Sequence, residues 1–187
     1  IGLPKRLLWV ISLTIIFGHN LLDQISFSNV PIIHSLWLIL HERGWIEFGD
    51  VIRFRTSYPV LPWIGVIALG YCIGAKVFDP SIEPNKRNKL LLTFGLSSMT
   101  LFFILRLINV YGDQAWSIMP TFTESLMSFI NVTKYPPSLL FILWNVGIGL
   151  ILLVILQKVE TKSWIKPLIV FGSVPMFFYI VHLYVLK

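Results

Sequence analysis

Five long apolar stretches constrain this chain more than any other feature. They cover about residues 6–22, 60–77, 90–109, 138–156 and 168–186, and each approaches the roughly 20 apolar residues that a helix needs to cross a ~30 Å hydrocarbon core. Only 13% of the residues are charged, against about 25% in a typical soluble domain. Because lipid offers the backbone no hydrogen-bond partner, we expect an all-α, polytopic transmembrane helix bundle with about five spans.

A shorter apolar run, residues 32–40, measures only about 13 Å as a helix. We therefore expect an interfacial or re-entrant helix there. The single cysteine, Cys72, excludes an internal disulfide and a cysteine-based metal cluster. Because the chain starts at Ile1 without a signal-peptide pattern, we expect one transmembrane domain, residues 1–187, that lacks the N-terminal helices of a longer protein.

Basic residues are distributed unevenly between the connections. The formal net charge is +6, but the charges lie between apolar runs and not along one polar face, so no nucleic-acid partner is expected. Three connections that fall on one side of alternating spans hold Lys5, Arg6, Lys76, Lys86, Arg87, Lys89, Lys158, Lys162 and Lys166. The other side holds Arg43, Arg53, Arg55 and Lys134, with Arg106 near its boundary. The positive-inside tendency predicts the first side in the cytoplasm and the chain in a bacterial inner membrane.

The two connections on the other side, about 23–59 and 110–137, are long and rich in aromatic, histidine and charged residues. Long loops of this kind usually carry the site of a scaffold. At the start of the first one, His19 and Asp23 are four residues apart, and Asn20 lies beside them on the helix end. A carboxylate beside an imidazole can act as part of a general base, whereas the alternative is a polar cluster that only caps the helix.

The end of the third stretch holds a second polar group. Arg106 and Asn109 are three residues apart and share a helical face, and Gly112 is expected to end the helix. An arginine one turn inside a span either snorkels or pairs with an acid. We expect Arg106 to pair with Asp23, because both lie at the outer ends of their spans. Its guanidinium could instead bind a carbonyl or phosphate oxygen.

The second long connection closes with the segment 131–138, in which two prolines fix an extended entry to the next helix. Ser138 is placed to cap that helix. Lys134 and Tyr135 could contact an acidic or sugar-like ligand, or could serve as an anchor pair at the membrane interface.

Histidines elsewhere in the chain carry weaker signals. His34 and His41 are seven residues apart, but no third ligand is spaced convincingly, so no metal site is predicted. His182 lies deep in the last stretch, where a helix–helix hydrogen bond is expected. No nucleophile elbow, phosphate loop, zinc helix or dinucleotide fingerprint is present in the sequence.

A further pattern runs in order along nearly the whole chain. It consists of the strings 19–23, 58–66, 69–71, 106–113, 129–139, 171–175, 177–179 and 182–184. Together these strings resemble the second half of the heparan-α-glucosaminide N-acetyltransferase-like family of membrane proteins. The resemblance implies a transmembrane acyltransferase that takes an acetyl group from cytoplasmic acetyl-CoA and passes it to an amino sugar or other acceptor on the outer side.

The resemblance also implies roles for particular residues. The catalytic histidine of the family would lie in helices upstream of Ile1, so no residue here inherits that role and the chain alone is expected to be inactive. Residues expected to line a chamber between the helices are His19, Asn20, Asp23, Arg106, Asn109, Asp113, Asn131, Lys134 and Tyr135. Residues expected either to attract the phosphates of CoA or to serve only as positive-inside flanks are Lys76, Lys86, Arg87 and Lys89.

Acetyl-CoA is thus the expected co-substrate, with no bound cofactor, and the lipid bilayer is the expected surrounding. Two other classes stay open, because polar residues inside spans also form passages for solutes or protons. One is a transporter or channel-like protein, and the other is a structural membrane protein whose partner supplies the activity. The sequence leaves a homo-oligomer open as well.

Overall fold

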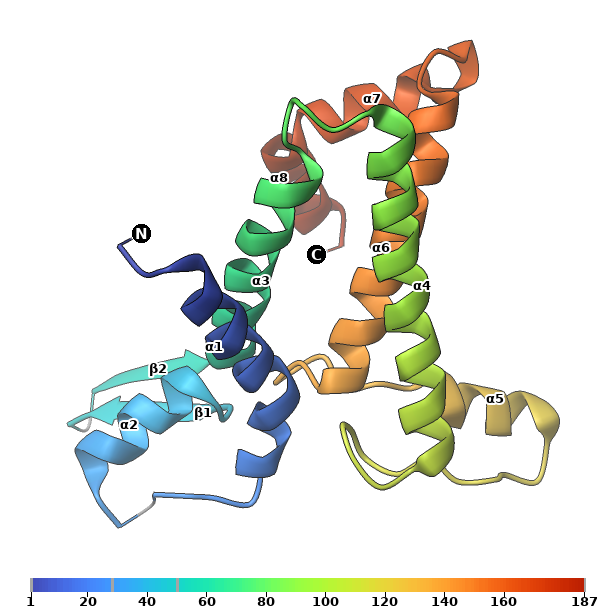
Figure 1. Cartoon of the computed structure of the whole chain (residues 1–187). Helices are drawn as coiled ribbons and strands as arrows, with labels where there is room; N and C mark the ends of the chain where they lie inside the picture. The colour runs from blue at the N-terminus through green and yellow to red at the C-terminus, as the bar shows by residue number, and fades with distance from the viewer. Residues whose placement is uncertain (1, 28, 50, 187) are drawn as a thin grey trace.

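A computed structural model describes residues 2–27, 29–49 and 51–186 of the chain (Figure 1). Among these residues, three helices are long and apolar enough to cross a membrane. They are α1 (Lys5–Gly18) continued by the 3-10 turn η1 (His19–Leu22), α4 (Pro84–Ile108) and α6 (Leu139–Val159). A mostly helical chain with helices that could cross a membrane is therefore confirmed.

The expected number of about five spans is wrong, because two of the apolar stretches do not form long helices. The stretch 60–77 forms α3 (Leu61–Val77), which has only 17 residues. The stretch 168–186 is divided between α7 (Lys166–Ser173) and α8 (Pro175–Val185), which meet at a bend of 81°. Pro175 causes this break, since its ring removes a backbone donor and disfavours helical geometry at the preceding residue. The described residues thus contain three candidate spans, or up to four if the bent pair counts as one.

The helices associate as two antiparallel pairs, α1 with α3 and α4 with α6 (Figure 1). In the second pair, Gly95 of α4 faces Gly147 of α6, and a Cβ added at Gly95 would lie only 3.1 Å from the carbonyl oxygen of Gly147. Small residues at such a crossing let two backbones approach closely, which is how helices associate in lipid. Ser98 adds a hydrogen bond across the pair, to the carbonyl oxygen of Leu143 at 2.8 Å.

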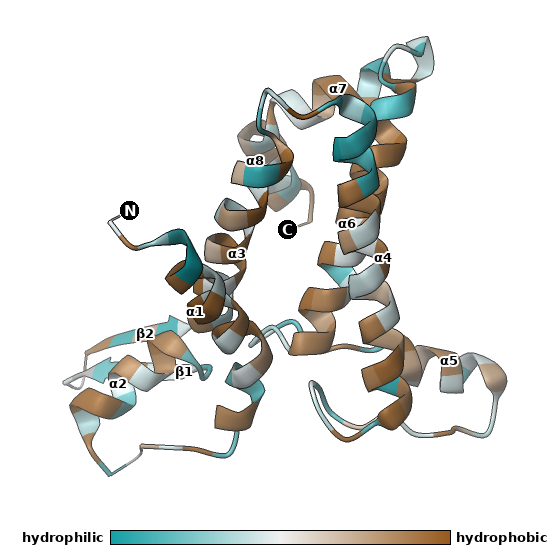
Figure 2. Cartoon of the chain, in the orientation of Figure 1, coloured by the Kyte–Doolittle hydropathy of each residue, from teal (hydrophilic) through white to brown (hydrophobic). Residues whose placement is uncertain are grey.

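The two pairs meet around a buried apolar cluster. Phe102 of α4 and Leu139 of α6 are fully buried there, and Ile16 of α1 packs against them. Farther along the helices, an apolar cavity of about 240 Å³ separates the pairs, and residues from all four helices line it. Figure 2 shows the apolar residues along the middle of these helices and polar residues where the helices end.

The first long connection contains α2 (Pro31–Leu40) and a hairpin of β1 (Gly44–Phe48) and β2 (Ile52–Thr56). The helix confirms the short apolar run as a helical element. The hairpin departs from the all-α prediction. Its strands pair antiparallel from Gly44 opposite Thr56 to Phe48 opposite Ile52, and Gly49 supplies the positive φ of +65° in the turn.

The second long connection contains α5 (Phe122–Ile130), which extends sideways at the end of α4 (Figure 1). Its start is a capping box, in which the Thr121 hydroxyl accepts from the Glu124 amide and the Glu124 carboxylate accepts from the Thr121 amide. Beyond α6, the short turn η2 (Ser163–Ile165) leads into α7.

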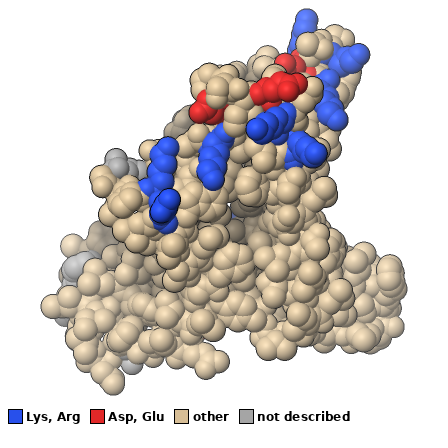
Figure 3. Space-filling model, viewed as in Figure 1, with Lys and Arg blue, Asp and Glu red and all other residues tan. Residues whose placement is uncertain are grey.

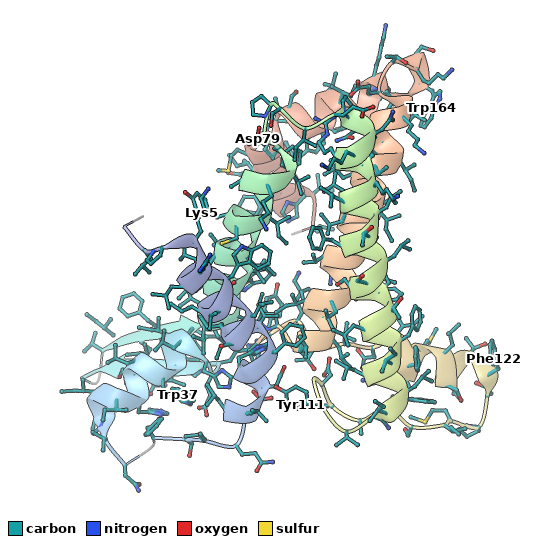
Figure 4. All side chains as sticks on the ribbon, in the orientation of Figure 1. Lys5, Trp37, Asp79, Tyr111, Phe122 and Trp164 are labelled. Carbon is teal, nitrogen blue, oxygen red and sulfur yellow. The ribbon has the colours of Figure 1, made fainter. Side chains whose placement is uncertain are left out.

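Lys and Arg side chains gather toward one end of the molecule in Figure 3, over the start of α1, the α3–α4 connection and the end of α6. Figure 4 places Lys5 and Asp79 toward this end, and Tyr111, Trp37 and Phe122 at the opposite end. The three connections that the sequence assigned to one side therefore do lie on one side. The opposite end, which carries both long connections, is called the loop end below.

Candidate functional site

A polar cavity of about 450 Å³ lies at the loop end, where η1, the end of α2 and the segments after α4 and α5 converge. Its size falls in the range of roughly 300–1,000 Å³ that holds small-molecule ligands. The residues that line it are Asn20, Asp23, His41, Glu42, Arg43, Asp113, Gln114, Thr133, Pro136 and Ser138.

Asp23 forms the central pair of this cavity with His41. The Nε2 atom of His41 lies 2.9 Å from Oδ1 of Asp23, and Asn20 donates from Nδ2 to the second carboxylate oxygen at 2.9 Å. His41 is only 1% exposed, whereas the Asp23 side chain is 46% exposed. The pairing of Asp23 with His19 that helical spacing favoured is therefore wrong, because α2 returns to place a different imidazole against the carboxylate.

The environment of Asp23 favours its charged form. Partial burial alone would raise its pKa, but the hydrogen bonds from His41 and Asn20, with the positive character of the two nearby histidines, outweigh burial. The pKa of Asp23 therefore lies below its ordinary value. A carboxylate that stays ionised and half exposed in a cavity is suited to bind an ammonium or hydroxyl group.

His19 is a structural tie and does not reach into the cavity as a free base. It is 2% exposed, with Nε2 at 2.9 Å from the carbonyl oxygen of Pro137 and Nδ1 at 2.9 Å from that of Ile16. Asn20 makes a second tie, since its Oδ1 accepts from the amide of Leu139 at 2.9 Å. These bonds fasten the end of α1 to the start of α6 and form the floor of the polar cavity.

Arg106 is 2% exposed and donates to main-chain carbonyl oxygens. Its acceptors are Gln114, Ser128, Phe129 and Asn131, at 2.8 to 2.9 Å. The predicted pair with Asp23 is wrong, because four backbone acceptors from the second long connection occupy the guanidinium. Arg106 therefore holds that connection in shape.

Asn109 ends α4, and the prediction that Gly112 does so is wrong. Asn109 adopts the left-handed conformation with a φ of 58°, which asparagine tolerates better than most residues. Its side chain then pairs with the backbone of Trp116 through two hydrogen bonds of 2.9 Å. Neither Asn109 nor Arg106 lines the polar cavity.

Asp113 organises the far wall of the cavity. Its carboxylate accepts from the amide and hydroxyl of Thr133, from the hydroxyl of Ser138 and from the amide of Gln114, at 2.6 to 2.8 Å. Ser138 in turn accepts from the amide of Phe141, which confirms it as the cap of α6. The Asp113 side chain thus accepts hydrogen bonds from two backbone amides and two hydroxyls, and it shapes the cavity more than it binds within it.

Asn131, Lys134 and Tyr135 lie outside the cavity lining. The Asn131 carbonyl oxygen accepts a hydrogen bond from Arg106, and Asn131 lines a separate surface hollow beside α5. Lys134 and Tyr135 lie near the mouth, next to the cavity residues Thr133 and Pro136, and Arg43 of the cavity wall lies 5.4 Å from the Tyr135 ring centre.

The basic residues expected to attract CoA lie at the end opposite the cavity. Lys76 places its Nζ 5.6 Å from the ring centre of Trp9. The Nε of Arg87 is buried without a hydrogen-bond partner, while Lys86 and Lys89 are exposed on the first turns of α4. Lys76, Lys86 and Lys89 are therefore exposed, whereas Arg87 is partly buried.

Among the described residues, no group of three or more His, Cys, Asp or Glu side chains is arranged to hold a metal ion. His34 and His41 stand on α2 and at its end, and His41 is engaged by Asp23. His182 is exposed on α8, where its Nδ1 lies 3.3 Å from the Phe178 carbonyl oxygen and its ring packs edge to face with Tyr179. Both partners belong to its own helix, so the described residues do not show the predicted helix–helix hydrogen bond.

The sequence reasoning missed six residues of the cavity lining, which are His41, Glu42, Arg43, Gln114, Pro136 and Ser138. Glu42 accepts a hydrogen bond from the Trp37 indole at 3.1 Å, and this contact holds it beside His41. A signal existed in the cluster of charges directly after the short apolar run. Only the path of α2 back toward α1, however, shows which of them face Asp23.

Comparisons of the chain with family models, with curated proteins and with solved structures give no match.

Proposed function

We propose that this chain forms the acceptor-binding half of a membrane acyltransferase, which moves an acetyl group from acetyl-CoA to an amino sugar or related acceptor. The observation that carries the proposal is the polar cavity at the loop end, with the Asp23–His41 pair at its centre. The resemblance to the heparan-α-glucosaminide N-acetyltransferase-like family gives the reaction class, and the cavity gives a place for an acceptor.

The chemistry fits an amine or hydroxyl nucleophile. In acetyl transfer the acceptor nitrogen forms a bond to the thioester carbon, the carbon–sulfur bond breaks, and the nitrogen must lose a proton. The ionised carboxylate of Asp23 holds the acceptor amine, and the buried imidazole of His41 hydrogen-bonds the same carboxylate. Overall, the proton that the nitrogen loses is taken up by the departing CoA thiolate. Glu42 adds a second carboxylate to the same wall.

The proposed donor side is the basic end, where Lys86 and Lys89 are exposed and Lys76 and Arg87 lie nearby in the sequence. Clustered basic residues attract the phosphates of CoA. With the basic end in the cytoplasm of a cell and the loop end outside its inner membrane, donor and acceptor would approach from opposite sides.

A transport function is less favoured by the interior of the helix pairs. A path for a polar solute needs polar groups along it, but the cavity between the pairs is lined almost wholly by apolar side chains. Ser98 lines it too, and its hydroxyl already donates to the Leu143 carbonyl.

Membranes that contain the full-length protein, labelled acetyl-CoA and a panel of amino sugars test the proposal. We expect label to enter an amino sugar, and we expect Asp23→Ala to raise the KM for the acceptor by about tenfold or more, since it removes a charged contact. The KM for acetyl-CoA should stay unchanged, and Arg53→Gln on the exposed hairpin is the matched control. Absence of both acetyl transfer and CoA binding would refute the acyltransferase proposal.

A further inference from the structure

Two cations and two phenols meet at the mouth of the polar cavity, in a cluster that the acceptor-binding carboxylates do not explain. The ring of Tyr135 has the Arg43 guanidinium 5.4 Å from its centre and the Lys134 ammonium at 5.1 Å. Its hydroxyl lies 3.1 Å from the hydroxyl of Tyr58, and the two rings pack edge to face at 4.8 Å. The mouth cluster, defined as Arg43, Tyr58, Lys134 and Tyr135, thus draws on both long connections.

The positive charges of the mouth cluster are not neutralised. Among the described residues, neither Arg43 nor Lys134 makes an ion pair with a carboxylate, whereas Arg53 on the hairpin pairs with Glu47 at 3.2 Å. The Tyr58 hydroxyl and the two cations lower the pKa of Tyr135.

The cavity is therefore divided by charge. Asp23 and Glu42 supply carboxylates on one part of the lining, and Arg43 supplies a guanidinium on the same lining toward the mouth cluster. A neutral sugar would leave the cationic part unused, while a ligand with an amine at one end and an anion at the other would match both parts.

The donor set of the mouth cluster suits a phosphate. A guanidinium offers a planar pair of N–H donors that matches phosphate oxygens, and an ammonium adds a compact charge. The Tyr58 hydroxyl, which accepts from the Tyr135 hydroxyl, can donate to a remaining oxygen. The carboxylates of Asp23 and Glu42 would repel the same group, which favours its binding at the mouth cluster.

We propose that the mouth cluster is a phosphate subsite and that the acceptor is an amino sugar phosphate, with its amine at Asp23 and its phosphate at Arg43 and Lys134. The role of this ligand as an acyl acceptor rests on the proposed acyltransferase function, whereas the phosphate-binding site does not depend on that function. The phosphate could belong to a soluble sugar phosphate or to a lipid headgroup, which share the same chemistry, and we assign it to the sugar.

Calorimetric titration of the chain in phosphatidylcholine nanodiscs tests the subsite, with glucosamine 6-phosphate and glucosamine as probes. We expect the phosphate form to bind at least about tenfold more tightly, since a charge-assisted contact of this kind is worth at least that factor. The double variant R43Q/K134Q should abolish this difference, and R43K should retain part of it. The matched control R53Q/R55Q removes two charges from the same end and should change nothing.

Equal affinity for the two sugars, or an equal loss in the hairpin control, would overturn the subsite. A parallel titration in phosphatidylglycerol nanodiscs separates the two sources of phosphate. Loss of sugar phosphate binding there would assign the cluster to lipid headgroups and overturn the proposal. Acetyl transfer to glucosamine 6-phosphate that R43Q/K134Q leaves unchanged would refute the subsite and keep the acyltransferase, whereas phosphate-dependent binding without any transfer would keep the subsite and refute the acyltransferase.

Discussion

Replacement of Arg106 by methionine should strongly destabilise the second long connection. The side chain is 2% exposed, and its guanidinium donates to the carbonyl oxygens of Gln114, Ser128, Phe129 and Asn131. Hydrogen bonds from a charged donor contribute about 1.5–3 kcal/mol each. Methionine would fill much of the volume but leave four carbonyls without this donor.

The four contributions do not simply add, because carbonyls near the end of α4 can recover some hydrogen bonds from water. We therefore expect a loss of about 3–5 kcal/mol in the free energy of unfolding, as for other buried charged groups that lose their partners. The free energy of unfolding of Arg106→Lys should lie between those of the unchanged chain and of Arg106→Met, since an ammonium keeps the charge but cannot reach all four acceptors in one geometry.

Denaturant titration in detergent micelles measures the global effect, and limited proteolysis between residues 110 and 137 measures the local one. Arg53→Met is the matched control, because the Arg53 side chain is 65% exposed on the hairpin and should change stability by no more than about 0.5 kcal/mol. If Arg106→Met matched this control in stability and in protease resistance, the assignment of Arg106 as the organiser of the connection would be refuted.

Three further predictions follow from the helix contacts and the cavity. Gly95→Ala should destabilise the α4–α6 pair by about 1–3 kcal/mol, because its Cβ would lie 2.9 Å from Ile151. The matched change Gly149→Ala meets nothing within 4 Å and should be neutral or stabilising by about 1 kcal/mol, so equal effects in denaturant titrations would contradict the close crossing. Because the folded-state pKa of Asp23 is lowered, its contribution to stability is complete above the ordinary value of 3.8 and is lost as the pH falls through the lowered value. Asp23→Asn should flatten the pH dependence of unfolding below about pH 4, and an unchanged profile would exclude the His41 contact as its cause. Thr121→Ala should cost about 1 kcal/mol through the lost cap and speed amide exchange at the start of α5, where unchanged exchange would argue against the capping box.

Hydropathy was enough to predict the parts of the fold that depend on composition. The long apolar stretches gave α1, α4 and α6, the short run gave α2, and Ser138 was recognised as a cap because capping depends on local geometry. The span count failed where backbone chemistry interrupts an apolar run. Pro175 divides the last stretch although its composition is uniformly apolar.

The β-hairpin was missed because its two short strands lie within a long connection that is rich in charged and aromatic residues, where their pattern does not stand out. Apolar and polar residues alternate along β2, and Gly49 stands in the turn, but a two-stranded hairpin is marginal alone and forms where neighbours support it. Here the strand start is held by the Thr56 hydroxyl, which bonds both backbone groups of Gly44 at 3.1 Å.

The candidate site was predicted in part, for a related reason. Asp23 and Asn20 do line the cavity. Helical spacing, however, identifies only partners three or four residues away, so His19 was chosen as the partner of Asp23 over a histidine 18 residues away. Arg106 was expected to find an acid. Its actual acceptors are main-chain carbonyls, which every residue carries and which no sequence pattern distinguishes.

The ties between α1 and α6 have a mechanical consequence. His19, Asn20 and the Tyr111 hydroxyl, which donates to the Phe17 carbonyl, fasten the two helix pairs together at the loop end. At the basic end, the pairs are joined by the chain between Val77 and Pro84. Any rigid-body rotation of one helix pair against the other therefore has its axis near the loop end. Such a rotation would widen the basic end most and leave the polar cavity almost unchanged.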